Sequence, residues 1–189
     1  MTLVLAASSA EAQSPANIRI RGTIMAVDAT TLSVKSRDGR DLKIALPEAV
    51  AVSFPKAVRL EDIKEGDFVG TTTRAGPNGT EVALEIHFLP PTANAGQTPY
   101  DLEPKSKMIN ARVQAKVART GDHEITLQYA NDTQKVVVPP GTPIVRSVPG
   151  PRADLVVGEY VFVSAQPAGD GVLTALRVQV SKDGVRSPQ

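Results

Sequence analysis

The chain contains two copies of one sequence pattern, and this internal repeat limits what it can fold into. Shifting the sequence by 92 positions places many residues of the first half on identical residues of the second half. The identical pairs are Pro47 and Pro139, Asp62 and Asp154, Gly66 and Gly158, Val69 and Val161, Gly79 and Gly171, and Ala83-Leu84 and Ala175-Leu176. Two copies of one small domain therefore account for most of the 189 residues, and every other pattern is interpreted once per copy.

Each copy consists of short segments in which β-branched and apolar residues alternate with polar ones, separated by turn residues. This alternation is typical of half-buried strands, and Asp38-Gly39 is a strong hairpin signal. The strands expected in copy one are 22–27, 32–36, 42–46, 50–54, 68–72 and 81–88, with about one helical turn at 60–63. The strands expected in copy two are 111–118, 125–129, 134–138, 143–146, 160–165 and 172–180.

The order of these elements predicts an all-β protein with two tandem barrels. Three meander strands, a helical connection and a closing hairpin are the order of a small Greek-key barrel of the OB type. We expect barrels at 18–88 and 108–182, a Pro-rich linker at 89–107 and a tail at 183–189. The alternative is a single β-sandwich shared by both copies.

Composition argues against several classes of protein. Copy one holds ten Lys/Arg and ten Asp/Glu, and copy two holds eight against six, so neither has the basic excess that a nucleic-acid backbone demands. Aromatic residues are only 4% of the chain, which leaves few platforms for stacking bases. The absence of Cys removes disulfides, thiolate metal sites and thiol nucleophiles.

The N-terminus is typical of an exported protein. A short apolar run at 2–7 is followed by Ala10-Glu11-Ala12, an A-x-A cleavage pattern, although a charged segment before the run is missing. We interpret 1–17 as the remainder of a signal peptide, with a disordered Ala/Ser-rich tail as the alternative. No segment approaches the roughly 20 apolar residues of a membrane span, so a soluble periplasmic or secreted protein is expected.

Three segments resemble exported proteobacterial proteins that are built from domains of unknown function. These segments are 21–28 (Arg-Gly-Thr-Ile-Met-Ala-Val-Asp), 62–70 (Asp-Ile-Lys-Glu-Gly-Asp-Phe-Val-Gly) and Tyr100-Asp101-Leu102. The resemblance covers most of 18–180 and implies a repeated β-barrel in the bacterial envelope. Such proteins often carry an automatic label suggesting metal transport, which fits poorly because a permease must span a membrane.

Candidate site residues are few. A groove between the two copies is the preferred ligand site, because clefts between domains commonly bind ligands, and its expected lining is Tyr100, Asp101, His87 and Arg112. His87 alternates with Ile86 and Phe88, so it faces away from them. His123 lies in Asp122-His123-Glu124, whose neighbouring side chains would point to opposite faces of a strand.

These observations predict a non-enzymatic binding or scaffolding module with an unknown protein or small-molecule partner in the envelope. No nucleophile-and-base motif or phosphate-binding glycine loop occurs in the sequence, and no cofactor is expected. The alternative function is a periplasmic metal-binding or metal-handling protein that uses His87 or His123 as a ligand.

Overall fold

The computed structural model describes residues 17–118, 123–169 and 171–189, and these residues form an all-β fold. The expected signal remnant lies almost entirely outside them. The strands are β1 (Ile18–Val27), β2 (Thr31–Ser36), β3 (Asp41–Ala45), β4 (Ala51–Ala57), β5 (Phe68–Ala75), β6 (Glu81–Phe88), β7 (Gly96–Pro99), β8 (Lys107–Ala118), β9 (His123–Tyr129), β10 (Asp132–Val138), β11 (Ile144–Pro149), β12 (Tyr160–Pro167) and β13 (Leu173–Val180). Single 3₁₀ turns are η1 (Leu60–Asp62), η2 (Pro77–Gly79) and η3 (Arg152–Asp154). The all-β class predicted from the sequence is therefore confirmed.

Local sequence explains the first meander. In β2 the side chains alternate between buried and partly exposed positions, as its apolar/polar alternation predicts. The chain then reverses at Asp38-Gly39, where Gly39 has a φ of 88° that suits glycine. β3 follows and pairs antiparallel with β2.

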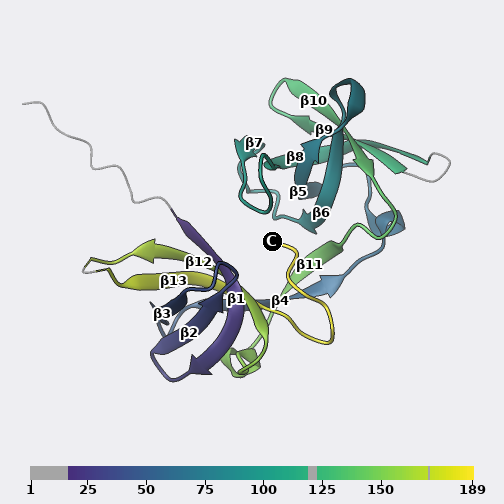
Figure 1. The fold of residues 1–189 in the computed structure, drawn as a ribbon. Coiled ribbons are helices and arrows are strands. Elements are labelled where there is room, and N and C mark those ends of the chain that lie inside the picture. Colours follow the sequence, from purple (N-terminus) through teal and green to yellow (C-terminus); the bar gives the residue numbers. More distant parts are fainter. Residues whose placement is uncertain (1–16, 119–122, 170) are drawn as a thin grey trace, which may run out of the picture.

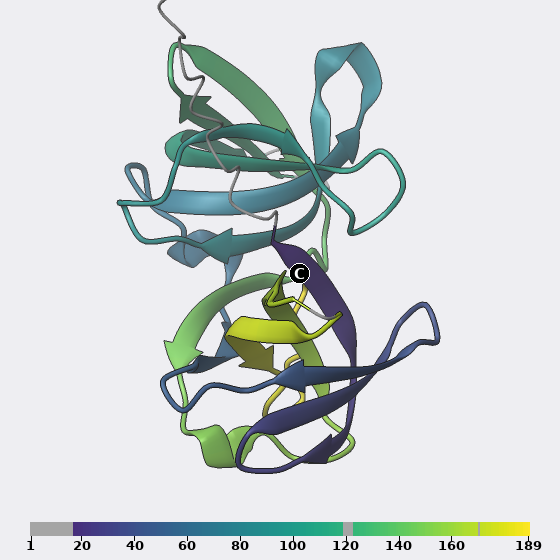
Figure 2. The ribbon, with the colours of Figure 1, turned by 90° about the vertical axis from the view of Figure 1, so that its left-hand side faces the viewer.

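The strands close into two five-membered rings. The first barrel contains β1, β2, β3, β13 and β12, because β1 pairs with both β2 and β12, and β13 pairs with both β12 and β3. The second barrel contains β5, β6, β10, β9 and β8, closed by the pairs β5–β8 and β6–β10. Figure 2 shows the two barrels stacked one above the other.

Each barrel takes its meander from one copy and its closing hairpin from the other. The strand pairing therefore crosses the boundaries expected at 18–88 and 108–182. The hairpin β5–β6 of copy one closes the meander of copy two, and the hairpin β12–β13 of copy two closes the meander of copy one. The physical reason is that β4 and β11 do not turn back. They run as extended strands that carry each hairpin across to the other meander (Figure 1).

β4 and β11 pair with each other around a local twofold axis. Pro55 pairs with Ser147, and these two residues are related by the 92-residue shift of the repeat (147 − 55 = 92). On either side, Ser53 pairs with Pro149 and Ala57 with Val145, again as equivalent pairs. An exchange of hairpins about a twofold axis is the geometry of a domain-swapped dimer, here within one chain.

The linker expected at 89–107 is partly a strand. β7 pairs antiparallel with β8, from Gly96 opposite Asn110 to Pro99 opposite Lys107. Strands are shared between the copies, as the sandwich alternative supposed, but they close into rings rather than stacking as two open sheets.

Each hydrophobic core depends on both copies. The core of the first barrel joins Ile24, Leu32 and Ile44 of copy one to Val163 and Val178 of copy two, and all five side chains are nearly or completely buried. Burying one aliphatic side chain contributes about 1.5–3 kcal/mol. A meander without its exchanged hairpin would therefore expose half of its core.

This arrangement predicts that the two halves remain associated after the chain is cut between them. We expect a protease site inserted between Asn94 and Ala95, in the connection between β6 and β7, to yield two fragments that co-elute in gel filtration and separate only in denaturant. The reason is that seven ladders join the fragments: β1–β12, β3–β13, β4–β11, β4–β13, β5–β8, β6–β10 and β6–β11. Separation of the fragments in native buffer would contradict the exchange.

Candidate ligand site between the barrels

A cavity of about 340 Å³ lies at the junction where β4 and β11 cross between the barrels. Its floor is formed by 51–53 of β4 and by Val145, Ser147 and Pro149 of β11. Its walls come from His87 to Pro90 of the second barrel and from Phe162 and 177–179 of the first barrel. We name it the junction cavity. Its walls are mostly apolar with a few polar groups, which is the usual composition of a small-ligand site.

His87 is the most constrained polar residue of the junction cavity. It is 7% exposed, and its Nδ1 lies 2.9 Å from Oε2 of Glu85, which is completely buried. Oε1 of Glu85 accepts hydrogen bonds from the backbone N and the Oγ1 of Thr72, at 2.9 and 2.5 Å. Since a carboxylate only accepts, Nδ1 carries a hydrogen, and Nε2 is an acceptor when the ring is neutral.

Glycine at position 70 makes room for this imidazole. A methyl group on Gly70 would lie 2.6 Å from Cε1 of His87 and 2.9 Å from Oδ1 of Asn110. Asn110 Oδ1 is buried and has no hydrogen-bond partner among the described residues. Nε2 of His87 and Oδ1 of Asn110 therefore both lie against Gly70, but Asn110 is not among the residues that line the junction cavity.

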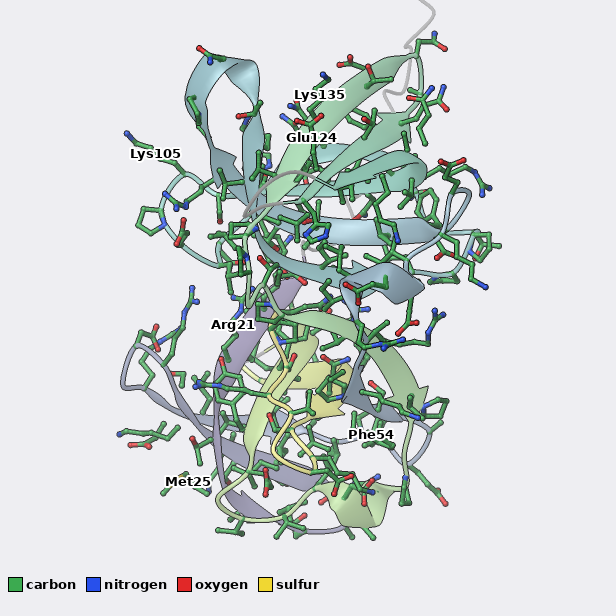
Figure 3. The ribbon with its side chains drawn as sticks, turned by 90° about the vertical axis from the view of Figure 1, so that its right-hand side faces the viewer. Arg21, Met25, Phe54, Lys105, Glu124 and Lys135 are labelled. Carbon is green, nitrogen blue, oxygen red and sulfur yellow. The ribbon has the colours of Figure 1, made fainter. Side chains whose placement is uncertain are left out.

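Tyr100 and Asp101 do not line the junction cavity. They contact Arg19 and Arg21 of β1, and we name these four residues the latch. Asp101 accepts two hydrogen bonds from the guanidinium of Arg21, at 3.0 and 3.1 Å. The Tyr100 ring stacks under Arg19, 4.5 Å from the guanidinium carbon. Arg21 is almost fully buried and lies where the two barrels meet (Figure 3). These contacts fasten the linker to β1.

The latch has a clear electrostatic basis. Partial burial alone would raise the pKa of Asp101, but the hydrogen bonds and positive charge of Arg21, with a contribution from Arg19, outweigh it and lower that pKa below its ordinary value. Burial raises the pKa of the Tyr100 hydroxyl, and the charge of Arg21 opposes this rise.

Arg112 and His123 lie away from the junction cavity. Arg112 is exposed, donates a hydrogen bond to the carbonyl of Gly66 at 3.2 Å and lies over the ring of Phe68. His123 borders a different hollow beside Pro139 and Pro140. Its neighbour Asp122 lies outside the described residues. Of the residues predicted to line a groove between the copies, only His87 lines the junction cavity.

The lining residues of copy two were not predicted. Among them, Phe162, Arg177 and Gln179 stand 92 positions after Gly70, Glu85 and His87 (for example 179 − 87 = 92). The repeat could have indicated Gln179, because it is the equivalent of His87 and the two line the same cavity. Gly70 and Glu85, the equivalents of Phe162 and Arg177, do not line it. The arginine supplies a cation next to the Phe162 ring, 5.8 Å from its centroid.

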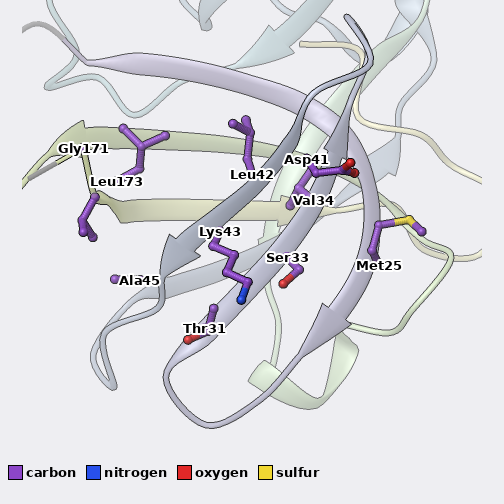
Figure 4. A pocket seen from close by; sticks show the side chains of 11 residues that line it. Met25, Thr31, Ser33, Val34, Asp41, Leu42, Lys43, Ala45, Gly171 and Leu173 are labelled. Atoms are coloured by element: carbon purple, nitrogen blue, oxygen red, sulfur yellow. The ribbon is translucent and has the colours of Figure 1, made fainter.

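A larger hollow, of about 670 Å³, lies on the outside of the first barrel (Figure 4). It is bordered by Met25, Leu42 and Leu173, and its acidic residue Asp41 is already paired with Lys35 at 3.1 Å. It holds no buried charged group comparable to the Glu85–His87 pair. We therefore take the smaller junction cavity as the candidate site.

Comparison with protein-family models, curated proteins and solved structures finds no significant match to this chain. Among the described residues, no helix has the length and apolar character needed to cross a membrane. The same residues contain no group of three His, Cys, Asp or Glu side chains placed to hold a metal ion.

The latch predicts a pH-dependent loss of stability. We expect Asp101→Asn to lower the free energy of unfolding by about 1–2 kcal/mol at pH 7, since it leaves the buried Arg21 charge without its partner while half-exposed Asp101 is partly screened. The pKa of Asp101 is lower in the folded protein than in the unfolded chain. The stabilisation by the Asp101 carboxylate is therefore fully present at pH values above the unfolded pKa of about 3.9, and it is lost as the pH falls through the folded pKa.

Urea unfolding of wild type and Asp101→Asn at pH 7 and at pH 2–3 measures how the difference in their free energies of unfolding depends on pH. Asp41→Asn, which breaks the exposed pair with Lys35, is the matched control and should cost no more than about 0.5 kcal/mol. A difference between wild type and Asp101→Asn that is the same at both pH values would contradict the role of the carboxylate charge.

The packing of His87 on Gly70 predicts a coupled pair of substitutions. Gly70→Ala should cost about 1–3 kcal/mol because the methyl displaces the imidazole from Glu85. In a His87→Ala background the methyl has room, so the same change should cost at least about 1 kcal/mol less. Denaturant unfolding of the four proteins in this cycle gives the coupling, and strictly additive effects would disprove the contact.

Proposed function

We propose that this protein is a non-enzymatic binding module of the bacterial envelope, in which two OB-like Greek-key barrels share exchanged hairpins and hold a ligand between them. The observation that carries this proposal is the junction cavity, to which both barrels contribute and in which the buried carboxylate of Glu85 orients His87. Clefts at domain interfaces with apolar walls and a few placed polar groups are common ligand sites.

The chemistry of the cavity indicates the kind of ligand. The apolar surface of Phe88, Leu89 and Pro149, which line the cavity and are not buried, suits an apolar body. Nε2 of His87 accepts a hydrogen bond, whereas the guanidinium of Arg177 binds an acceptor or an anion. We therefore expect a ligand with an apolar part that carries both hydrogen-bond donors and acceptors.

Binding fits this geometry better than catalysis. A carboxylate-oriented imidazole resembles the base of a nucleophile-and-base pair, but within the described residues no hydroxyl is hydrogen-bonded to Nε2 of His87. The serines that line the cavity, Ser53 and Ser147, come from β4 and β11, and Ser147 is bonded instead to Gln179 at 3.3 Å. The N-terminal pattern and the resemblance described above support a location in the bacterial envelope.

A metal-handling role is the second candidate. It is favoured by the Glu85–His87 pair, since metal-bound histidines usually donate their other ring N–H to a carboxylate. Nε2 of His87 and Oδ1 of Asn110 would then be the protein ligands, and solvent or a substrate would complete the coordination.

Native mass spectrometry of the protein, exported to a periplasm and purified without chelators, tests both candidates. We expect an added mass that matches an organic ligand rather than a metal ion, and this mass should disappear in Ser147→Trp, which fills the junction cavity. Lys56→Trp, on the same ladder but outside the cavity lining, is the control and should keep the added mass.

The other outcomes separate the candidates. An added mass of one Cu or Zn ion that is lost in His87→Ala and retained in His123→Ala would favour the metal role. An added mass that survives Ser147→Trp would place the ligand elsewhere and reject the junction cavity as the site.

A further inference from the structure

The C-terminal segment turns back into the junction. After β13 the chain reverses at Asp183-Gly184, where both residues have positive φ (53° and 76°), as in the tight turns of hairpins. The turn is closed by two hydrogen bonds between Lys182 and Val185. Figure 1 shows that the end of the chain then lies near β11, in the region between the barrels.

The residues after this turn are held by specific contacts. Ser187 is 4% exposed: its backbone N donates to Oγ of Ser181 at 3.3 Å, and its hydroxyl donates to Oε1 of Gln179 at 2.6 Å. Arg186 stacks on the ring of Tyr160, 3.6 Å from its centroid. Gln189 is 9% exposed and lines the junction cavity. We name 184–189 the tail.

The tail engages only one side of a nearly symmetric site. Gln179, which accepts the bond from Ser187, also donates to Ser147 on the cavity floor, so the tail is connected to the floor through this side chain. Its counterpart across the twofold axis is His87, which is bonded to Glu85 and not to the tail. Polar groups of the cavity are therefore already used to bind a peptide segment.

We propose that the tail is a tethered occupant of the junction cavity and that the external ligand is an extended peptide segment with hydroxyl and carboxamide side chains, which displaces it. This inference rests on the proposed function, namely that the junction cavity is a binding site. The tail has few hydrogen bonds, and the Asp183-Gly184 turn lets it swing away without disturbing β13. Its attachment gives it a high effective concentration, so it raises the apparent Kd of a competing peptide.

Fluorescence anisotropy with a labelled peptide of the tail sequence, Gly-Val-Arg-Ser-Pro-Gln, tests the proposal. We expect a chain that ends at Asp183 to bind this peptide at least tenfold more tightly than the full chain does. A peptide with Ala in place of Ser should bind about tenfold more weakly, because it loses the bond to Gln179. Ser147→Trp in the shortened chain should abolish binding.

A second variant covers the case in which the shortened chain does not fold, as judged by circular dichroism. The full chain with Arg186→Ala and Ser187→Ala retains the tail but loses its stacking and its bond to Gln179, so it should also bind the peptide more tightly than wild type. Equal affinities for the folded variants and wild type, or no binding by either variant, would overturn the proposal.

These outcomes also separate the two proposals. If no variant binds the peptide while native mass spectrometry still shows a ligand that Ser147→Trp removes, only the role of the tail fails. If Ser147→Trp affects neither peptide nor ligand, the junction cavity itself is not the binding site.

Discussion

The antiparallel ladder between β4 and β11 is the interaction on which the rest of the structure depends. Its central pair, Pro55 and Ser147, lies on the local twofold axis, so each strand delivers its hairpin to the opposite meander in the same way. If either strand turned back instead, each hairpin would close its own copy and the two barrels would share no ladder. The extended conformation of β4, with seven residues, and of β11, with six, thus decides the topology of the described part of the chain.

The candidate site is a consequence of this exchange. Equivalent positions on the closing hairpins, such as His87 and Gln179, are brought to opposite walls of one cavity because the twofold axis passes between them. The two copies have different residues at these positions. One wall carries a buried carboxylate with an imidazole, and the other carries Arg177 beside Phe162, so a symmetric framework holds an asymmetric set of polar groups.

Sequence patterns were sufficient for the strands of the two barrels and for their turns, but not for β7 in the expected linker or for the exchange. Val69 pairs with Ala111 of copy two and Val161 with Gly22 of copy one. Because the two hairpins have the same residue at this position, either hairpin would present a valine to either meander, and no pattern distinguishes the two closures. His87 could be recognised by its alternation with Ile86, whereas the latch depends on Arg21, whose burial follows from tertiary packing alone.

The exchanged hairpins also set the order in which the barrels can be completed as the chain emerges from a ribosome. The second barrel has all of its strands once Val138 has emerged, but the first barrel waits for β13, which ends at Val180. The barrel that contains the first strand is therefore the last to close. Until then, the outer edges of β1 and β3 have no partners, and unpaired edges of this kind can pair with other chains.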